Sequence, residues 1–289
     1  MIAIESLFAT PASLPVVPKV VQELIESFGR DDVSIEEIAE QIEADPVLCA
    51  KTLRLANSAY FHVSRTISTV DDALRMLGFV MVRNLVTGCG VAGAFKGLVG
   101  LDLKAFWRHS LHTACAASWL AQAADENSDR AFTIGLLNGL GHLVMHAARP
   151  AGLAELDKEI EPLALGRAAA ERARFGFHHG DVGAELARRW NFPDEISETL
   201  RRVPDPLSGP AVDAMAAIVH VAAWRARVAH FGWSSEEAEA SFPLGVGKAA
   251  RLQLRWLPAL ATLGGIHPSL ADPMPPLEEL SEGLEGMFG

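Results

Sequence analysis

The sequence is poor in the residue types that mark several large classes of protein. Its 289 residues include only three cysteines, which are far apart and form no CxxC pair: Cys49, Cys89 and Cys115. This excludes a small disulfide-stapled scaffold and predicts reduced, buried thiols in a cytoplasmic protein. There is a single tyrosine, and alternating runs of Val, Ile and Thr are nearly absent, which disfavours a fold built from strands.

Basic residues and long apolar runs are also scarce. The chain has 25 Lys and Arg against 36 Asp and Glu, a formal charge of -11, and this negative balance disfavours broad binding of nucleic acid. Gly, Asn or His interrupts every apolar stretch before it reaches about 18 residues, so we expect no membrane span. The start, MIAIESLFATPASLP, makes a poor signal peptide. The glycine-rich patterns of nucleotide-binding loops are absent.

What the sequence does contain is a succession of helix signals. Hydrophobic residues make up 49% of the chain, enough for a sizeable core. Three helix starts are clear: the capping box SIEE at 34–37, Asp45 followed by Pro46, and Thr69 followed by Asp72. The sequence therefore predicts an all-α fold with short connections.

One apolar stretch carries unexpected polar residues. Residues 130–149 read RAFTIGLLNGLGHLVMHAAR, and they include Asn138, Gly139, Gly141, His142 and His146. The two histidines are four apart and share one helix face, a spacing that can chelate a metal. The alternative is structural: His142 forms a local hydrogen bond, and His146 complements the dipole at the C-terminal end of the helix. We favour the structural interpretation, because no Asp or Glu accompanies these histidines in the stretch.

Six segments together resemble the HDOD family, a branch of the HD-domain superfamily. They follow one another between residues 14 and 225: LPVVPKVVQEL (14–24), DPVLCAKTLRLANSAYF (45–61), ISTVDDALRMLGFVMVRNLV (67–86), WRHSLHTA (107–114), GLLNGLGHLV (135–144) and FHHGDVGAELARRWNFP (177–193). The resemblance implies a bacterial signalling or regulatory role. It also implies an N-terminal helical subdomain (1–100), an HD-like helical core (101–230) and a C-terminal extension with an acidic, Pro-rich tail (231–289).

The resemblance also implies where metal ligands would lie. In HD phosphohydrolases, histidines and aspartates on neighbouring helices hold divalent metals that acidify a water molecule. Position by position, the ligand set falls here on His109, the pair Asn138-Gly139, His179, the region of Val203-Pro204, and Ala223. Two neutral imidazoles without a carboxylate lack the charge to hold a catalytic metal. We therefore predict a vestigial cleft of His109, Asn138, His142 and His179, with no metal, cofactor or catalytic residue.

The resulting function is a non-catalytic signal-transduction protein, a helical scaffold that binds a signalling protein or senses a ligand. We expect an unidentified protein partner, or a small anionic ligand in the cleft with Arg108 assisting, and neither nucleic acid nor membrane. The alternative is a metal-dependent phosphohydrolase acting on nucleotides or phosphodiesters through rearranged ligands, His109, His142 and His179. We expect the apolar segment 243–264 and the acidic tail to cover the core of their own domain.

Overall fold

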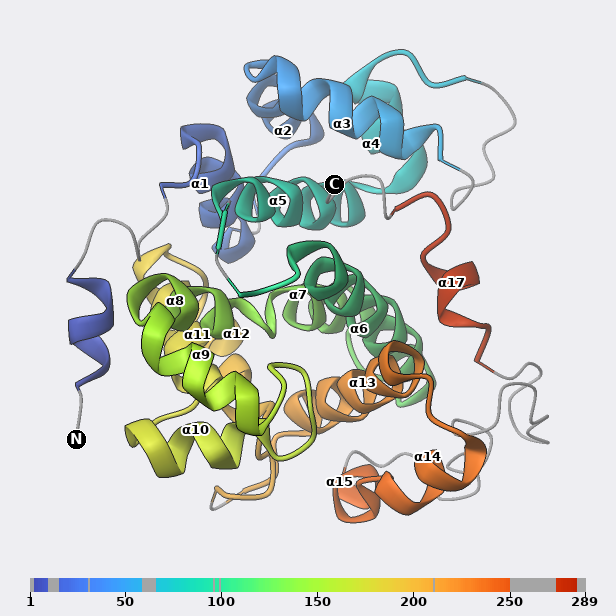
Figure 1. Ribbon diagram of the computed structural model, residues 1–289. Coiled ribbons are helices and arrows are strands. Elements are labelled where there is room, and N and C mark those ends of the chain that lie inside the picture. Colours follow the sequence, from blue (N-terminus) through green and yellow to red (C-terminus); the bar gives the residue numbers. More distant parts are fainter. Residues whose placement is uncertain are drawn as a thin grey trace.

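The computed structural model describes residues 3–9, 16–30, 32–58, 66–95, 97–98, 100–209, 211–249 and 274–284. Within these ranges the chain is helical and contains no strand, so the predicted all-α fold is confirmed (Figure 1). Cys89 and Cys115 are buried, as expected, whereas Cys49 is only partly buried.

The first group of helices packs on one side of the molecule (Figure 1). It comprises α1 (Lys19–Glu26), the short 3-10 turn η3 (Ser27–Gly29), α2 (Ile35–Glu43), α3 (Pro46–Ala56), α4 (Val70–Leu77) and α5 (Phe79–Ala94). The caps read from the sequence are present, because the side chains of Ser34, Asp45 and Thr69 each accept a backbone N–H of their own helix. Between α4 and α5 the chain turns by 119° at Gly78, whose φ of 87° suits glycine.

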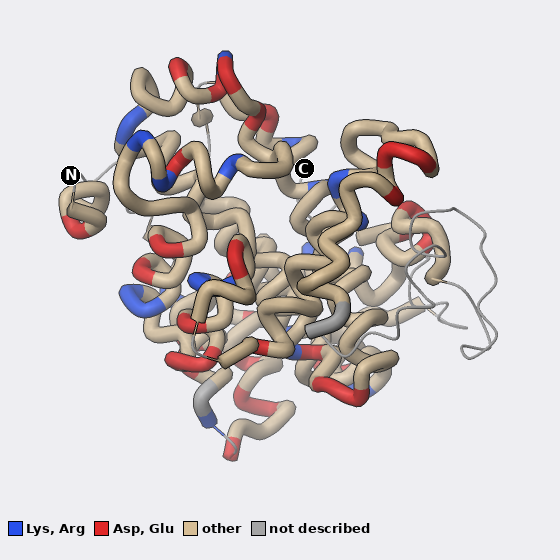
Figure 2. The backbone as a smooth tube through the Cα atoms, turned by 90° about the horizontal axis from the view of Figure 1, so that it is seen from below, with Lys and Arg blue, Asp and Glu red and all other residues tan. Residues whose placement is uncertain are grey.

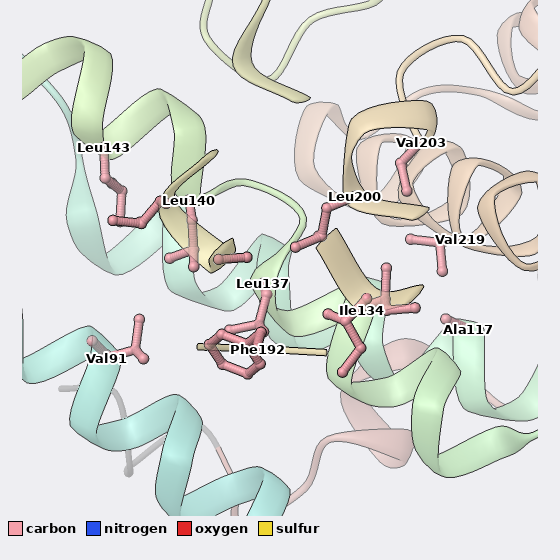
Figure 3. Close-up of a cluster of buried hydrophobic side chains, with 14 of the residues drawn as sticks. Val91, Ala117, Ile134, Leu137, Leu140, Leu143, Phe192, Leu200, Val203 and Val219 are labelled. Atoms are coloured by element: carbon pink, nitrogen blue, oxygen red, sulfur yellow. The ribbon is translucent and has the colours of Figure 1, made fainter. Parts of the chain in front are cut away.

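The second group of helices forms the larger core. It comprises α6 (Leu103–Ala123), α7 (Ser128–Leu137), α8 (Leu140–Ala148), α9 (Pro150–Glu159), α10 (Arg167–Phe175), α11 (His179–Arg189), α12 (Asp194–Arg202) and α13 (Ala214–Phe231). Helix α6 packs between α7 and α13, and α11 packs against both α8 and α12. Figure 3 shows apolar side chains of α7 and α8, among them Leu137 and Leu140, meeting Phe192 and Leu200 in the interior.

Helices α7 and α8 together make a long apolar stretch of the described chain. Ser128–Ala148 meets the length and hydropathy criteria for a membrane span, and 89% of its apolar window is buried inside the protein. The helix pair α4 and α5 passes the same criteria only if the sharply bent pair is counted as one span. The burial of Ser128–Ala148 is that of a core helix.

Both ends of the described chain pack onto the core. The 3-10 turn η1 (Ile4–Phe8) contacts α8 and buries Leu7 and Phe8. After α13 come α14 (Ser235–Ser241) and α15 (Leu244–Ala249), and α17 (Leu277–Leu280) returns to α6 with Leu277 fully buried. The tail thus covers the core at 277–280. The apolar segment lies outside the described residues from position 250 on, and the division into 1–100, 101–230 and 231–289 stays a prediction.

Candidate functional site

The positions assigned by the family resemblance converge on one cavity of about 300 Å³. They reach it from four helices and two connections. Its lining includes His109 on α6, Asn138 and Gly139 between α7 and α8, His142 on α8, His179 on α11, Val203 and Pro204 after α12, and Ala223 on α13. The structure therefore brings together all four residues of the predicted cleft.

The position matching the aspartate of the His-Asp pair is filled by an aromatic ring. A Cβ atom at Gly139 would lie 2.6 Å from Cζ of Phe106, a buried residue of α6. Real Cβ contacts are almost never that short, so Gly139 and the ring of Phe106 fit each other. The carboxylate is not merely missing here: its space is occupied by apolar atoms.

Two histidines of the cavity wall stack on each other. The ring centroids of His142 and His179 are 3.9 Å apart at an interplanar angle of 21°. Gly141 permits this contact, because a Cβ there would overlap the backbone carbonyl oxygen of His179 and lie 2.8 Å from the backbone nitrogen of Gly183. Because Gly141 has no side chain at this crossing, α8 and α11 approach closely enough for the two imidazole rings to stack.

The expectation that the cleft has no carboxylate is wrong. Glu171 of α10 is fully buried beside the stacked imidazoles, a residue that the sequence interpretation did not single out. Its Oε2 accepts hydrogen bonds from His179, at 2.8 Å from the backbone nitrogen and 2.7 Å from Nδ1. Its Oε1 accepts one from Nε of Arg167 at 3.0 Å and lies 3.1 Å from Nδ1 of His142.

The sequence carried a weak signal for this carboxylate. Arg167, Glu171 and Phe175 follow one another at intervals of four on α10, and all three are buried. A pair of opposite charges four residues apart is ordinarily an exposed ion pair. Here the pair shares a helix face with a phenylalanine, which indicates a buried stripe.

Burial and charge act in opposite directions on this cluster. Burial alone would raise the pKa of Glu171, but the neighbouring imidazoles of His179 and His142 hold it well below its ordinary range. Burial, reinforced by the nearby His179, lowers the pKa of His142 to about 3. At neutral pH the cluster thus holds an ionised carboxylate against a neutral His142. Because an ionised carboxylate only accepts hydrogen bonds, Nδ1 of His179 carries the proton.

One cluster in the described residues has the geometry to hold a metal. Ligand atoms of His142, Glu171 and His179 all lie within 4.8 Å of one another. The carboxylate of Glu171, however, already has four nitrogen neighbours: three hydrogen-bond donors and Nδ1 of His142. A carboxylate has about four lone-pair sites, so none is left for a metal ion. An ion entering between these groups would displace Arg167 and the backbone N–H that begins α11. The donor set is the right kind for a metal but is already used within the protein.

Of the other polar residues named from the sequence, His178 also lines the cavity, whereas His146 and Arg108 do not. Nε2 of His146 lies 3.7 Å from Asp157, and His146 does not line the cavity. His178 caps α11 through a reciprocal pair of hydrogen bonds with Asp181. Arg108 borders a neighbouring cavity with His112 and not this one, so it does not assist the predicted cleft directly.

The described lining of the cavity contains more basic than acidic residues, although the chain is acidic. Three arginines line it: Arg167, Arg172 and Arg227. Among the described lining residues, the exposed Asp205 is the acidic one. Elsewhere basic and acidic positions are interspersed along the chain (Figure 2). Carboxylates behind the wall pair with two of these arginines, Arg167 and Arg172, so the described residues leave Arg227 as the lining arginine without a carboxylate partner.

Comparison with known proteins places this arrangement in a family context. A curated protein of Treponema pallidum (strain Nichols), described as uncharacterized, is 28% identical over 195 residues, which are 65% of this chain. The chain spans 37% of the length of that relative. A structure from Shewanella amazonensis SB2B, described as a candidate phosphohydrolase, has a TM-score of 0.76 at 25% identity and covers 98% of both chains.

A second solved structure is an HDOD domain protein of unknown function from Geobacter sulfurreducens. It has a TM-score of 0.67 at 27% identity and covers 82% of this chain and 83% of its own. The model of the HDOD domain matches residues 14–206, more than half of the chain, and these residues contain all the cleft positions from His109 to Pro204. With these matches and the helical fold, the chain belongs to the HDOD domain family.

Proposed function

We propose that this HDOD protein is a non-catalytic signal-transduction protein, a helical scaffold whose cleft binds rather than hydrolyses. The proposal rests on one observation: at three positions that correspond to metal ligands, apolar atoms stand where a ligand side chain would be. The ring of Phe106 fills the space at Gly139, Val203 points into the core (Figure 3), and a methyl group stands at Ala223. Three of the positions that would supply ligands thus supply none.

The buried carboxylate supports the same proposal. Glu171 compensates the charge of Arg167, which is itself buried and also pairs with Asp157 at 2.7 Å. It also accepts the first backbone N–H of α11, a group that has no partner within its own helix. Removing one partner of a buried ion pair leaves an uncompensated charge. Glu171 therefore stabilises the fold through contacts that a bound metal ion would disrupt.

The output of such a scaffold is an interaction with another protein. An unidentified signalling partner remains a prediction supported by the family resemblance. A cytoplasmic location remains a prediction from the three separate cysteines of the sequence. A scaffold without chemistry can transmit a signal only by presenting a surface whose affinity for a partner changes with its own state.

The test measures metal content and turnover together. Protein purified without a chelator is analysed by mass spectrometry for Mn, Fe, Zn and Mg. It is then incubated with bis-p-nitrophenyl phosphate in the presence of added Mn²⁺. We expect substoichiometric metal and no hydrolysis above the blank. Metal-dependent hydrolysis that disappears in the His179→Ala variant would refute the proposal.

The alternative is a phosphohydrolase with rearranged ligands. Two observations favour it: the mutual distances within the cluster of His142, Glu171 and His179, and the likeness to a structure described as a candidate phosphohydrolase. It predicts one metal ion per chain and loss of that ion in Glu171→Gln. The same metal analysis therefore separates the two functions.

A further inference from the structure

Helix α13 presents one stripe of three residues to the cavity. His220, Ala223 and Arg227 are spaced by three and four positions, which places them on one helix face, and all three line the cavity. The family model ends at residue 206, so this helix lies outside the matched region. The stripe is a property of this chain that the family match does not supply.

Arg227 differs from the other arginines of the cavity because the described part of the chain offers it no carboxylate partner. Arg167 pairs with Glu171 and Asp157, and Arg172 approaches Asp181 at 3.5 Å. For Arg227 the described residues supply one contact, a hydrogen bond of 2.7 Å from Nε to the backbone carbonyl of Leu163. Burial lowers its pKa to about 10, with no acidic group opposing the shift. At neutral pH it remains a cation.

The groups around Arg227 are compatible with a bound anion. Besides burial, the charge of Arg227 contributes to lowering the pKa values of His109 and His220, which shows that both imidazoles lie within its electrostatic reach. Nδ1 of His220 lies 2.7 Å from the carbonyl oxygen of Val203, so that ring is held in place. Ala223, between His220 and Arg227, adds neither bulk nor negative charge. The lining carboxylate is Asp205, which is exposed and therefore screened by water, and the buried Glu171 behind the wall is paired with Arg167.

We propose that this cavity binds a small oxyanion of the phosphate class, with Arg227 as its anchor and without a metal ion. The inference rests on the proposed function in that the cleft binds rather than hydrolyses. A guanidinium group presents paired N–H donors that match two oxygens of a phosphate. A cavity of about 300 Å³ is at the small end of ligand sites, which fits phosphate or a small phosphomonoester better than a dinucleotide.

The experiment is calorimetric titration of the full chain with inorganic phosphate, at constant ionic strength and with a chelator present. We expect saturable binding by the unmodified protein. Arg227→Gln removes the anchoring charge and should weaken binding about tenfold or more, the effect of losing about 1.4 kcal/mol from a charge-assisted contact. Arg108→Gln removes the same charge from an exposed position outside this cavity and should bind phosphate within about twofold of the unmodified protein.

A second variant keeps the test decisive if Arg227→Gln fails to fold. Ala223→Asp leaves Arg227 in place and sets a carboxylate four residues before it, where the two can pair on the helix. We expect this variant to lose phosphate binding to the same extent. Saturable binding that is unchanged in a folded Arg227→Gln or Ala223→Asp variant would overturn the inference, as would the lack of any binding by the unmodified protein.

Hydrolysis measured on the same protein preparations, without chelator and with added Mn²⁺, separates this inference from the proposed function. Phosphate binding that depends on Arg227, combined with metal-dependent turnover, would refute the non-catalytic function and leave the anion site standing. Absence of both binding and turnover would remove the anion site and leave the non-catalytic function standing.

Discussion

The ring of Phe106 occupies the space that a side chain at Gly139 would need, because a Cβ atom there would lie 2.6 Å from Cζ of the ring. The two residues come from different helical segments, and the contact closes the position at which an HD phosphohydrolase would place its aspartate. Several consequences of this packing and of the buried cluster next to it can be measured.

We predict that Gly139→Ala lowers the free energy of unfolding by about 1–3 kcal/mol, because the added methyl group overpacks a filled region. Gly93→Ala is the matched control, since a Cβ at that glycine of α5 meets nothing within 4 Å. The control should be neutral or stabilising by up to about 1 kcal/mol. Urea denaturation followed by circular dichroism measures both. Equal effects of the two substitutions would contradict the proposed fit of Gly139 to Phe106.

We predict a larger loss, of about 3 kcal/mol or more, for Gly141→Ala. There the new Cβ meets the backbone of α11, which cannot rotate away as a side chain can. Gly183 lies across the same helix crossing, but its Cβ would be 3.4 Å from the nearest atom, the backbone nitrogen of Gly141. Gly183→Ala should therefore cost clearly less. Thermal melts of the two variants make the comparison, and a reversed order would contradict the close approach of α8 and α11.

Glu171→Gln should destabilise the fold by about 3–5 kcal/mol, because it leaves Arg167 buried with a weaker counter-charge. Glu159→Gln is the control. Glu159 also pairs with an arginine, Arg174, but its side chain is 66% exposed, so the loss should stay below about 1 kcal/mol. Denaturant titration at pH 7 measures both. A Glu171→Gln protein as stable as the original would contradict the structural role of the Glu171 carboxylate.

The pH dependence of stability should report the buried, neutral His142. Its pKa is lowered from 6.5 to about 3 in the folded protein. As the pH falls below about 6.5, the unfolded chain takes up a proton that the folded chain refuses, so stability falls by about 1.4 kcal/mol per pH unit for this residue. Above the ordinary pKa of histidine the effect vanishes.

The measurement is a series of urea titrations between about pH 6 and about pH 5, above the range in which carboxylates titrate. His142→Gln should show a slope of stability against pH that is flatter by about 1.4 kcal/mol per unit than that of the original protein. His109, whose pKa burial also lowers, remains in both proteins and contributes equally. Parallel slopes would show that His142 is protonated or exposed in the folded state.

The sequence by itself determined the fold class, the helix starts and four residues that line the cavity, but neither Glu171 nor Arg227. These features depend on local signals: a cap such as Ser34 is satisfied within its own helix, and the histidines of the family segments lie at recognisable positions. The loss of the His-Asp pair at Asn138 and Gly139 could likewise be seen directly, because it is a statement about residue identity.

Only the tertiary structure decided the charge of the cleft. Glu171 and Arg167 are four residues apart on α10, a spacing that ordinarily indicates a solvated pair. The shared face with Phe175 is a weak sign of burial, and it does not show that this face packs against His142 and His179. In the same way, Arg167 pairs with Asp157 of another helix, whereas the described residues bring no carboxylate to Arg227. Desolvation and ion pairing depend on distances between segments remote in sequence, and those distances exist only once the helices have packed.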